Sequence, residues 1–184
     1  MSEGGGSWQA AGEGQPSALA VFCSLIDHLN VWVARVLGAS IVVVTAAILY
    51  EVVARGWAGQ ATLWANETTV YLSAMTYLLG GGYALMRGGH VRIDLIYGAL
   101  GPSAKKFADV ISFICFALYV GALVWVGTQM AWSSFLQSEG TGTPWNPPIW
   151  PVKMAIPIAG LLLLLQGIAN LLRELGIVAE EPAL

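Results

Sequence analysis

Long apolar stretches alternate with short polar segments along this chain, and the lengths of the apolar stretches predict its fold class. Four stretches are nearly free of charge. At a rise of about 1.5 Å per residue, each is long enough to cross a hydrocarbon layer of about 30 Å. We therefore predict an all-α integral membrane protein with four transmembrane helices, at about residues 31–54, 65–86, 107–137 and 152–172.

A shorter amphipathic pattern lies between the second and third predicted spans. Over residues 91–100 the apolar side chains fall on one helical face, while Arg92 and Asp94 fall elsewhere. Gly and Pro follow directly and supply a stop. The pattern predicts an interfacial amphipathic helix on the cytoplasmic side of the membrane.

The two ends of the chain and its composition complete this outline. Residues 1–17 are rich in Gly, Ser and Ala without the pattern of a signal peptide, so we predict a disordered cytoplasmic tail there and a second tail at 174–184. Residues 18–173 then form the membrane domain. With 57% hydrophobic and 10% charged residues and a formal net charge of -3, the chain is not a candidate for nucleic-acid binding.

Basic residues predict the orientation, because cytoplasmic flanks of membrane helices retain Lys and Arg. Only Arg55 and Lys153 fall on one side of the four spans. The other side carries Arg35, Arg87, Arg92, Lys105, Lys106 and Arg173. Both termini are therefore predicted to be cytoplasmic, and the outer boundary then gathers an aromatic belt of Trp57, Trp64, Trp132, Trp145 and Trp150.

Few polar side chains lie within the predicted spans or at their ends. Glu51, Arg55 and Glu67 fall at the mouth of the hairpin formed by the first two spans, where we expect a salt-bridged clasp; a proton-relay carboxylate and a contact with a partner subunit are the alternatives. Gln166 and Asn170 share one face of the fourth span, which must meet protein, either another span of this chain or a different subunit.

Other residues indicate packing rather than chemistry. Three consecutive glycines of the second span, Gly80, Gly81 and Gly82, predict close approach to a neighbouring helix. The histidines, His28 and His90, lie outside the predicted spans, which argues against haem ligation. His90 and Asp94 suggest a surface hydrogen bond rather than a metal site, and we expect neither enzymatic activity nor a bound cofactor.

Three short motifs, taken in order, resemble a known family. They are YEVVAR at residues 50–55, LWANE at 63–67 and ALMRGGHVRID at 84–94. Their order and spacing resemble the small membrane subunit, DctQ-like, of tripartite ATP-independent periplasmic (TRAP) transporters. In that family an Arg closes the first span, a Trp and a Glu open the second, and an H-[IV]-x-[IV]-D run follows; the matching residues are Arg55, Trp64, Glu67, His90, Val91, Ile93 and Asp94.

The resemblance covers about residues 31–172. The run PWNPPIWPVKMAIPIAG at residues 144–160 is also similar to the loop and last span of one branch of the family. One departure is Gly56, where the family commonly has an aromatic residue.

The resemblance implies a transport role in the bacterial inner membrane. It implies a large membrane subunit that carries the substrate and sodium sites, and a periplasmic binding protein that delivers an organic acid. This chain would be a scaffold, with Trp145 and Trp150 in a docking loop and with Arg35, Arg87, His90, Arg92, Asp94, Lys105 and Lys106 at the lipid headgroups.

Two other functions remain open from the residues alone. One is a membrane anchor for a redox enzyme. The other is a small self-sufficient channel or efflux carrier with Glu51 or Glu67 as the coupling residue.

Overall fold

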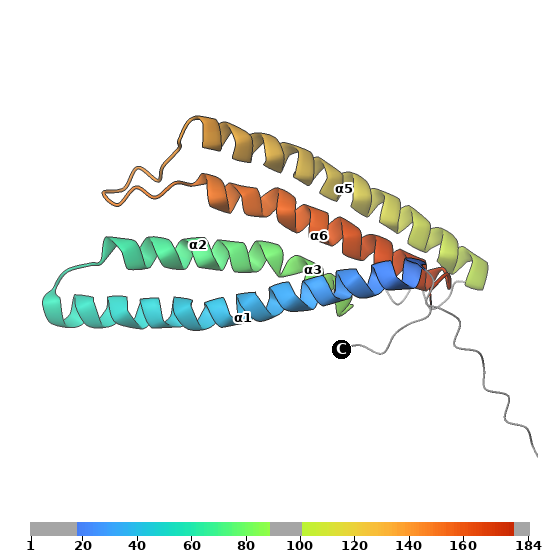
Figure 1. Ribbon diagram of the computed structural model, residues 1–184, viewed down its shortest axis with the longest axis horizontal. Coiled ribbons are helices and arrows are strands. Elements are labelled where there is room, and N and C mark those ends of the chain that lie inside the picture. Colours follow the sequence, from blue (N-terminus) through green and yellow to red (C-terminus); the bar gives the residue numbers. More distant parts are fainter. Residues whose placement is uncertain (1–17, 89–100, 179–184) are drawn as a thin grey trace, which may run out of the picture.

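The computed structural model describes residues 18–88 and 101–178, and its regular elements over this part of the chain are helices. The helices run up and down in one bundle (Figure 1). In chain order they are α1 (Ala18–Ala58), α2 (Leu63–Leu79), α3 (Gly81–Met86), α5 (Pro102–Leu136) and α6 (Trp150–Glu174).

The connection from α1 to α2 and the connection from α5 to α6 lie at the same end of the bundle (Figure 1). We call this end, with residues 59–62 and 137–149, the loop end, and the opposite end, where residues 18 and 178 lie, the terminal end. Within residues 18–88 and 101–178, three helical segments are long and apolar enough to cross a membrane: Ala18–Trp57, Ala104–Leu136 and Trp150–Glu174.

The second predicted span is divided between α2 and α3. α2 has 17 residues, and Gly80 separates it from α3. The Gly80 N–H donates to the Thr76 carbonyl at 3.0 Å, and the Gly80 carbonyl accepts from the Ala84 N–H at 3.0 Å. Backbone hydrogen bonding therefore continues through the glycine, so the two helices follow one another as a single rod.

The first helix begins at Ala18, well before the predicted span that starts near Val31. Polar residues such as Asp27 and Asn30 interrupt the apolar pattern there, but the helix accommodates them. Asn30 Nδ2 donates to the Ile26 carbonyl at 3.2 Å, and further polar partners lie on α6. The bounds of α5 and α6 differ from the predicted spans by a few residues only.

The chain also stays packed beyond the end of α6. The Ile177 N–H donates to the Leu172 carbonyl at 3.0 Å, and Val178 is buried in a cluster with Cys23, Ile26 and Ala169. The predicted C-terminal tail is thus ordered as far as Val178. The predicted interfacial helix at 91–100 and the tail at 1–17 lie outside the described residues, as do 179–184.

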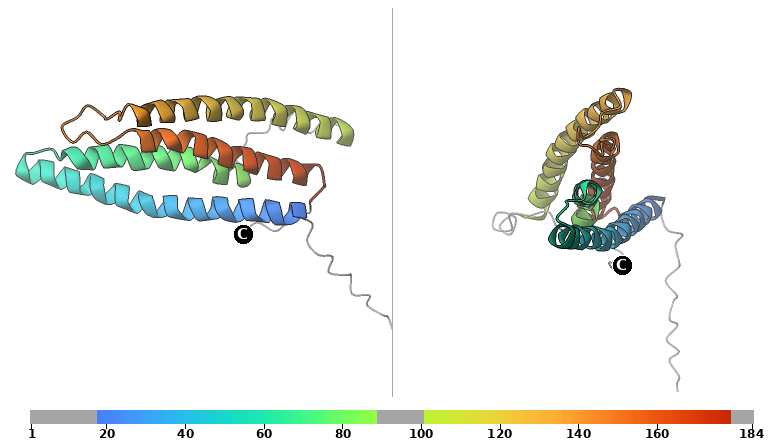
Figure 2. Two further views of the ribbon diagram at one scale, coloured as in Figure 1. Left: turned by 45° about the horizontal axis from the view of Figure 1, so that its top comes forward. Right: turned by 90° about the vertical axis from the view of Figure 1, so that its left-hand side faces the viewer.

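α6 is the central helix of the bundle and contacts α1, α2, α3 and α5 (Figure 2). Small residues bring it close to α5: a Cβ at Gly167 would lie 2.7 Å from Phe116, and a Cβ at Gly160 would lie 2.5 Å from Val124. In a membrane, where lipid is as apolar as leucine, such close packing stabilises helix pairs.

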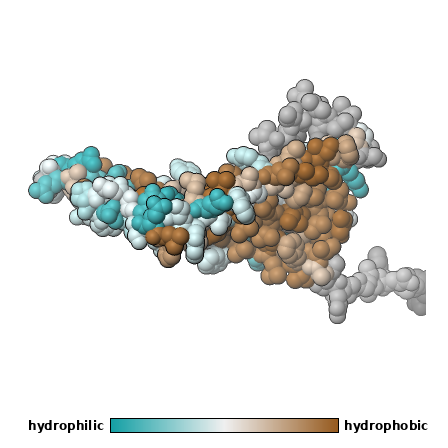
Figure 3. Space-filling model, turned by 90° about the horizontal axis from the view of Figure 1, so that it is seen from above, coloured by the Kyte–Doolittle hydropathy of each residue, from teal (hydrophilic) through white to brown (hydrophobic). Residues whose placement is uncertain are grey.

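The outer faces of α1 and α5 are apolar and largely uncovered. In the most apolar window of each helix, only 6% of α1 and 11% of α5 is buried, against 39% of α6. Seen from the α5 side, hydrophobic side chains cover the bundle towards its terminal end and give way to hydrophilic ones at the loop end (Figure 3). These faces are suited to lipid or to a partner protein.

Candidate functional site

A network of amide side chains joins α1 to α6 inside the bundle. Asn30 and Gln166 are both fully buried, and Asn30 Nδ2 donates to Gln166 Oε1 at 2.7 Å. Gln166 Nε2 in turn donates to Asn170 Oδ1 at 3.2 Å. These hydrogen bonds remove part of the cost of burying the amides, although Asn30 Oδ1 is buried without a hydrogen-bond partner among the described residues.

An ion pair closes the network towards the terminal end. Arg173 Nη2 lies 2.5 Å from Asp27 Oδ2, and the two side chains are 15% and 18% exposed. Asp27 Oδ1 also accepts a hydrogen bond from Gln166 Nε2 at 2.9 Å. The charged pair and the amides are thus one connected set.

The third helix of the network is α3, which approaches at Gly82. A Cβ at Gly82 would lie 2.2 Å from Asn30 Oδ1, so only glycine fits in this arrangement. Asn170 Nδ2 donates to the Leu85 carbonyl at 3.2 Å. Gln166 and Asn170 consequently meet other helices of their own chain.

The three consecutive glycines differ in their surroundings. A Cβ at Gly81 would make an ordinary contact with Leu163 at 3.5 Å, whereas one at Gly80 would lie 2.9 Å from the Thr76 carbonyl of its own rod. Gly82 is therefore the glycine at which another helix comes too close for any side chain.

At the loop end, Glu51 fastens the connection between α1 and α2. Arg55 Nε donates to Glu51 Oε1 at 2.8 Å, and the backbone N–H of Thr62 donates to Glu51 Oε2 at 2.9 Å. The Thr62 hydroxyl donates to the same oxygen. Glu51 and Arg55 are therefore together as expected for the clasp, with Thr62 as the third member.

Glu67 lies apart from that pair. Its Oε2 accepts a hydrogen bond from Thr141 Oγ1 at 3.3 Å, in the connection between α5 and α6. One turn along α2, the Tyr71 hydroxyl donates to the Pro148 carbonyl at 3.0 Å. The two side chains anchor this connection, residues 137–149, to α2; we call it the outer loop.

The outer loop has an internal structure of its own. The Ile149 N–H donates to the Glu139 carbonyl at 3.0 Å, and Gly140 and Pro148 form an isolated antiparallel bridge. Glu139 also pairs with Lys153, whose ammonium group holds the pKa of that carboxyl below its usual value. The loop is thus closed across its base.

The two tryptophans assigned to this region have different surroundings. Trp150 begins α6 and meets Phe135 edge-on, with 5.5 Å between ring centroids. Trp145 lies in the outer loop and is 48% exposed. Trp64 instead packs on Tyr50 at 5.4 Å between ring centroids.

The residues expected at lipid headgroups are only partly within the described chain. Arg35 is exposed on α1, Arg87 Nε donates to the Tyr83 hydroxyl at 3.1 Å, and Lys106 Nζ donates to the Leu175 carbonyl at 3.4 Å. Lys105 lies beside Lys106 in the first turn of α5. The remaining three, His90, Arg92 and Asp94, lie outside the described residues.

The residues that sequence reasoning missed are mostly partners of those it found. Asp27, Asn30 and Arg173 belong to the polar network, and Tyr71 and Thr141 hold the outer loop. A signal existed on α6, because residues at i, i+4 and i+7 share one helical face and here are Gln166, Asn170 and Arg173. Among the described residues, no group of three His, Cys, Asp or Glu side chains is placed to hold a metal ion.

Comparison with known proteins now decides the family. Residues 44–176 match the family described as tripartite ATP-independent periplasmic transporters, DctQ component. The chain belongs to this DctQ family. Its members are the small membrane component of tripartite systems that also contain a large membrane subunit and a periplasmic binding protein. The DctQ chain is accordingly a transporter component of the bacterial inner membrane.

A search of curated proteins finds no match to the DctQ chain. The matched range begins within α1 and ends just beyond α6. It contains Gln166, Asn170 and Arg173 but neither Asp27 nor Asn30. Two of the five side chains of the polar network therefore lie outside the matched range.

Proposed function

We propose that this chain is the static small permease subunit of a sodium-coupled, binding-protein-dependent uptake system for an organic acid, and that it scaffolds the large membrane subunit. One observation carries the scaffolding role. Asp27, Asn30, Gln166 and Arg173 bond to one another between α1 and α6, whereas the apolar outer faces of α1 and α5 are uncovered. A scaffold needs a closed interior and free outer faces.

The proposal includes a fourth span made of α2 and α3 together. The rod from Leu63 to Met86 is about 36 Å long at 1.5 Å per residue, which suffices for a hydrocarbon core of about 30 Å. Its two parts remain hydrogen-bonded through Gly80.

Both termini are proposed to be cytoplasmic. Arg55 and Lys153 are at the loop end, and the terminal end carries more basic residues, Arg87, Lys105, Lys106 and Arg173. The loop end, with the outer loop, then faces the periplasm.

The partners follow from this orientation. Sodium and substrate bind to the large subunit, and this chain holds no cofactor. Trp145 of the outer loop contributes to a docking surface for the periplasmic binding protein, with Glu67 and Tyr71 holding that loop in place. Arg35, Arg87 and Lys106 contact lipid headgroups.

Reconstitution tests the proposal. Proteoliposomes with an inward sodium gradient would receive the large subunit and the binding protein, with or without this chain, and a panel of radiolabelled organic acids. We expect uptake only when all three proteins are present. Uptake by this chain alone would instead support the channel or efflux carrier, and a haem band in its visible spectrum would support the redox anchor.

A further inference from the structure

The tip of the outer loop, residues 142–146, is held by its own side chains. The Gly142 N–H donates to Asn146 Oδ1 at 2.9 Å. The Asn146 N–H donates to Thr143 Oγ1 at 3.1 Å. The first and the last residue of the tip are thus fastened to each other, and the last residue is also fastened to Thr143.

The backbone of the tip is one that few residue types adopt. Gly142 and Asn146 have φ angles of 72° and 48°, which lie in the left-handed region that Gly and Asn tolerate best. The Asn146 side chain also reaches across the loop, because a Cβ at Gly140 would lie 2.2 Å from Asn146 Oδ1. The residue types of the tip therefore match this particular conformation.

Hydrogen bonds continue from the tip to a carboxylate on α2, and the positions of their hydrogens can be deduced. Thr143 Oγ1 lies 2.9 Å from Thr141 Oγ1, and the Thr141 hydroxyl donates to Glu67 Oε2 at 3.3 Å. Each threonine has a single hydroxyl hydrogen. The hydrogen of Thr141 is used on Glu67, so Thr143 must be the donor to Thr141. The Thr143 oxygen then accepts from the Asn146 N–H.

This series of hydrogen bonds couples the tip to the helices. Glu67 is 9% exposed and belongs to α2, so the series ends on a side chain inside the bundle. Hydrogen bonds that run in one direction strengthen one another, and removing one hydroxyl leaves its neighbours without a partner. Thr143 is the member of the series that joins the backbone of the tip to the side chains below it.

The tip carries one large apolar side chain. Trp145 is 48% exposed, and its neighbours Pro144 and Asn146 are exposed as well. Tryptophan is enriched among the side chains that dominate the free energy of binding at protein interfaces. A side chain that is already ordered binds more tightly, because less conformational entropy is lost on association. A Trp at the lipid headgroups needs no fixed orientation, so the ordered tip favours a protein partner.

We propose that Thr143 is a positioning residue, and that its hydrogen bonds hold the tip in the conformation that presents Trp145 to the periplasmic binding protein. The inference rests on the proposed function, which supplies the orientation and the partner. It adds that docking depends on one hydroxyl group, which itself does not touch the binding protein.

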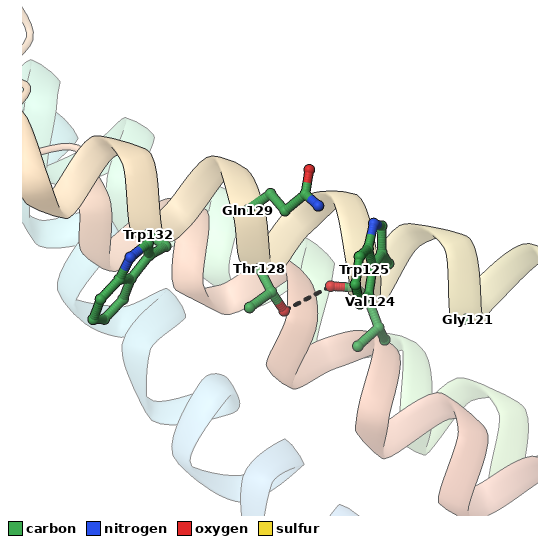
Figure 4. Close-up of a pocket in the computed structure, with 6 residues that line it drawn as sticks. All are labelled: Gly121, Val124, Trp125, Thr128, Gln129 and Trp132. Atoms are coloured by element: carbon green, nitrogen blue, oxygen red, sulfur yellow. Dashed lines mark hydrogen bonds between the residues drawn. The ribbon is translucent and has the colours of Figure 1, made fainter.

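Uptake by the reconstituted transporter, measured at increasing concentrations of the binding protein, tests the proposal. Thr143→Val removes the hydroxyl at nearly constant shape, and Thr143→Ser retains a hydroxyl. Thr128→Val is the matched control: Thr128 lies at a hollow on α5 and donates to the Val124 carbonyl of the same helix at 2.7 Å (Figure 4).

The expected effect is on the concentration of binding protein that gives half-maximal uptake. Thr143→Val should raise this concentration several-fold and change the maximal rate little, because a disordered tip weakens docking but not the transport step. Thr143→Ser should stay near the wild-type value, and Thr128→Val should equal it. Equal effects of Thr143→Val and Thr143→Ser would overturn the proposal, since the hydroxyl would then not be the cause.

A Trp145→Ala variant separates this inference from the proposed function. If Trp145→Ala raises the half-maximal concentration and Thr143→Val does not, the positioning role is wrong while the docking surface stands. If Trp145→Ala leaves that concentration unchanged, the docking surface of the proposed function is wrong, and the positioning role fails with it.

Fluorine NMR of the full-length chain tests the positioning without the binding protein. Fluorinated tryptophan is incorporated, and the signal of Trp145 is identified by its loss in Trp145→Phe. We expect one narrow Trp145 signal in the wild type, a shifted or split signal in Thr143→Val, and the wild-type signal again in Thr143→Ser. A Trp145 signal that is the same in all three proteins would overturn the proposal.

Discussion

Arg173 Nη2 lies 2.5 Å from Asp27 Oδ2, so the last turn of α6 is paired with a residue of α1 that is 146 positions away in the sequence. The same carboxylate accepts from Gln166, which links the ion pair to the buried amides. A contact of this kind joins α1 to α6 at the terminal end of the bundle.

Removing one member of this pair should destabilise the protein. Asp27→Ala leaves Arg173 largely buried without its partner, and we expect a loss of about 1 to 3 kcal/mol in the free energy of unfolding. Thermal unfolding in mild detergent measures it. Arg55→Ala is the control, since the Arg55 side chain is 62% exposed and its removal should shift the unfolding midpoint much less. Equal shifts for both variants would contradict the role of the pair.

The close approach at Gly82 predicts a sharp difference between two glycines. Gly82→Ala places a methyl group 2.2 Å from Asn30 Oδ1, so α3 or α1 must move and the amide network must loosen. Gly38→Ala on α1 meets nothing within 4 Å and should leave stability unchanged or slightly higher. The thermal unfolding midpoints of both variants provide the test, and a Gly82→Ala variant as stable as Gly38→Ala would show that the network is not tight.

Tyr71 offers a test of how the outer loop is held. Tyr71→Phe removes the hydrogen bond to the Pro148 carbonyl, a loss of about 1 kcal/mol. Amide exchange of loop residues, such as the Ile149 N–H, should then be about five-fold faster if local opening controls it. Tyr77→Phe is the matched control on the same helix, because Tyr77 is 84% exposed. Unchanged exchange in Tyr71→Phe would mean that Glu67 and the bridge across the loop suffice.

Acidification should loosen the outer loop only at pH values below the usual pKa of a carboxyl group. Lys153 holds the pKa of Glu139 below its ordinary value of 4.5. Because the pKa of Glu139 is lowered in the folded state, the pair stabilises the protein above pH 4.5. This stabilisation is lost as the pH falls through the pKa of Glu139 in the folded protein. The unfolding midpoint of the wild type, minus that of Glu139→Gln, should be constant from pH 7 to 5 and shrink below 4.5. A difference that shrinks already near pH 6 would assign the effect to another group.

The sequence predicts the helices well and their polar partners poorly, for a physical reason. Apolar length reports where a helix can cross a membrane, so the predicted stretches at 107–137 and 152–172 lie close to α5 and α6. The prediction from apolar length is wrong at the start of α1, because the polar residues Asp27 and Asn30 there resemble the end of a hydrophobic segment. These side chains are tolerated in the helix because residues of α6 pair with them.

The candidate site shows the same limit. Glu51 and Arg55 are one helical turn apart, so their pairing follows from local geometry. Glu67 was grouped with them because it opens the neighbouring span, yet its partner Thr141 is in the outer loop, 74 positions away. Long-range pairing of this kind depends on how helices rotate about their axes, which hydrophobic periodicity defines only coarsely.

The most direct test of the central claim is native mass spectrometry of this chain extracted from its own membranes in mild detergent. If the chain is a scaffolding subunit, it will appear in a complex with a much larger polytopic membrane protein, and the complex will dissociate only under conditions that disrupt helix packing. A chain that appears only as a monomer or as a complex of identical copies would contradict the account.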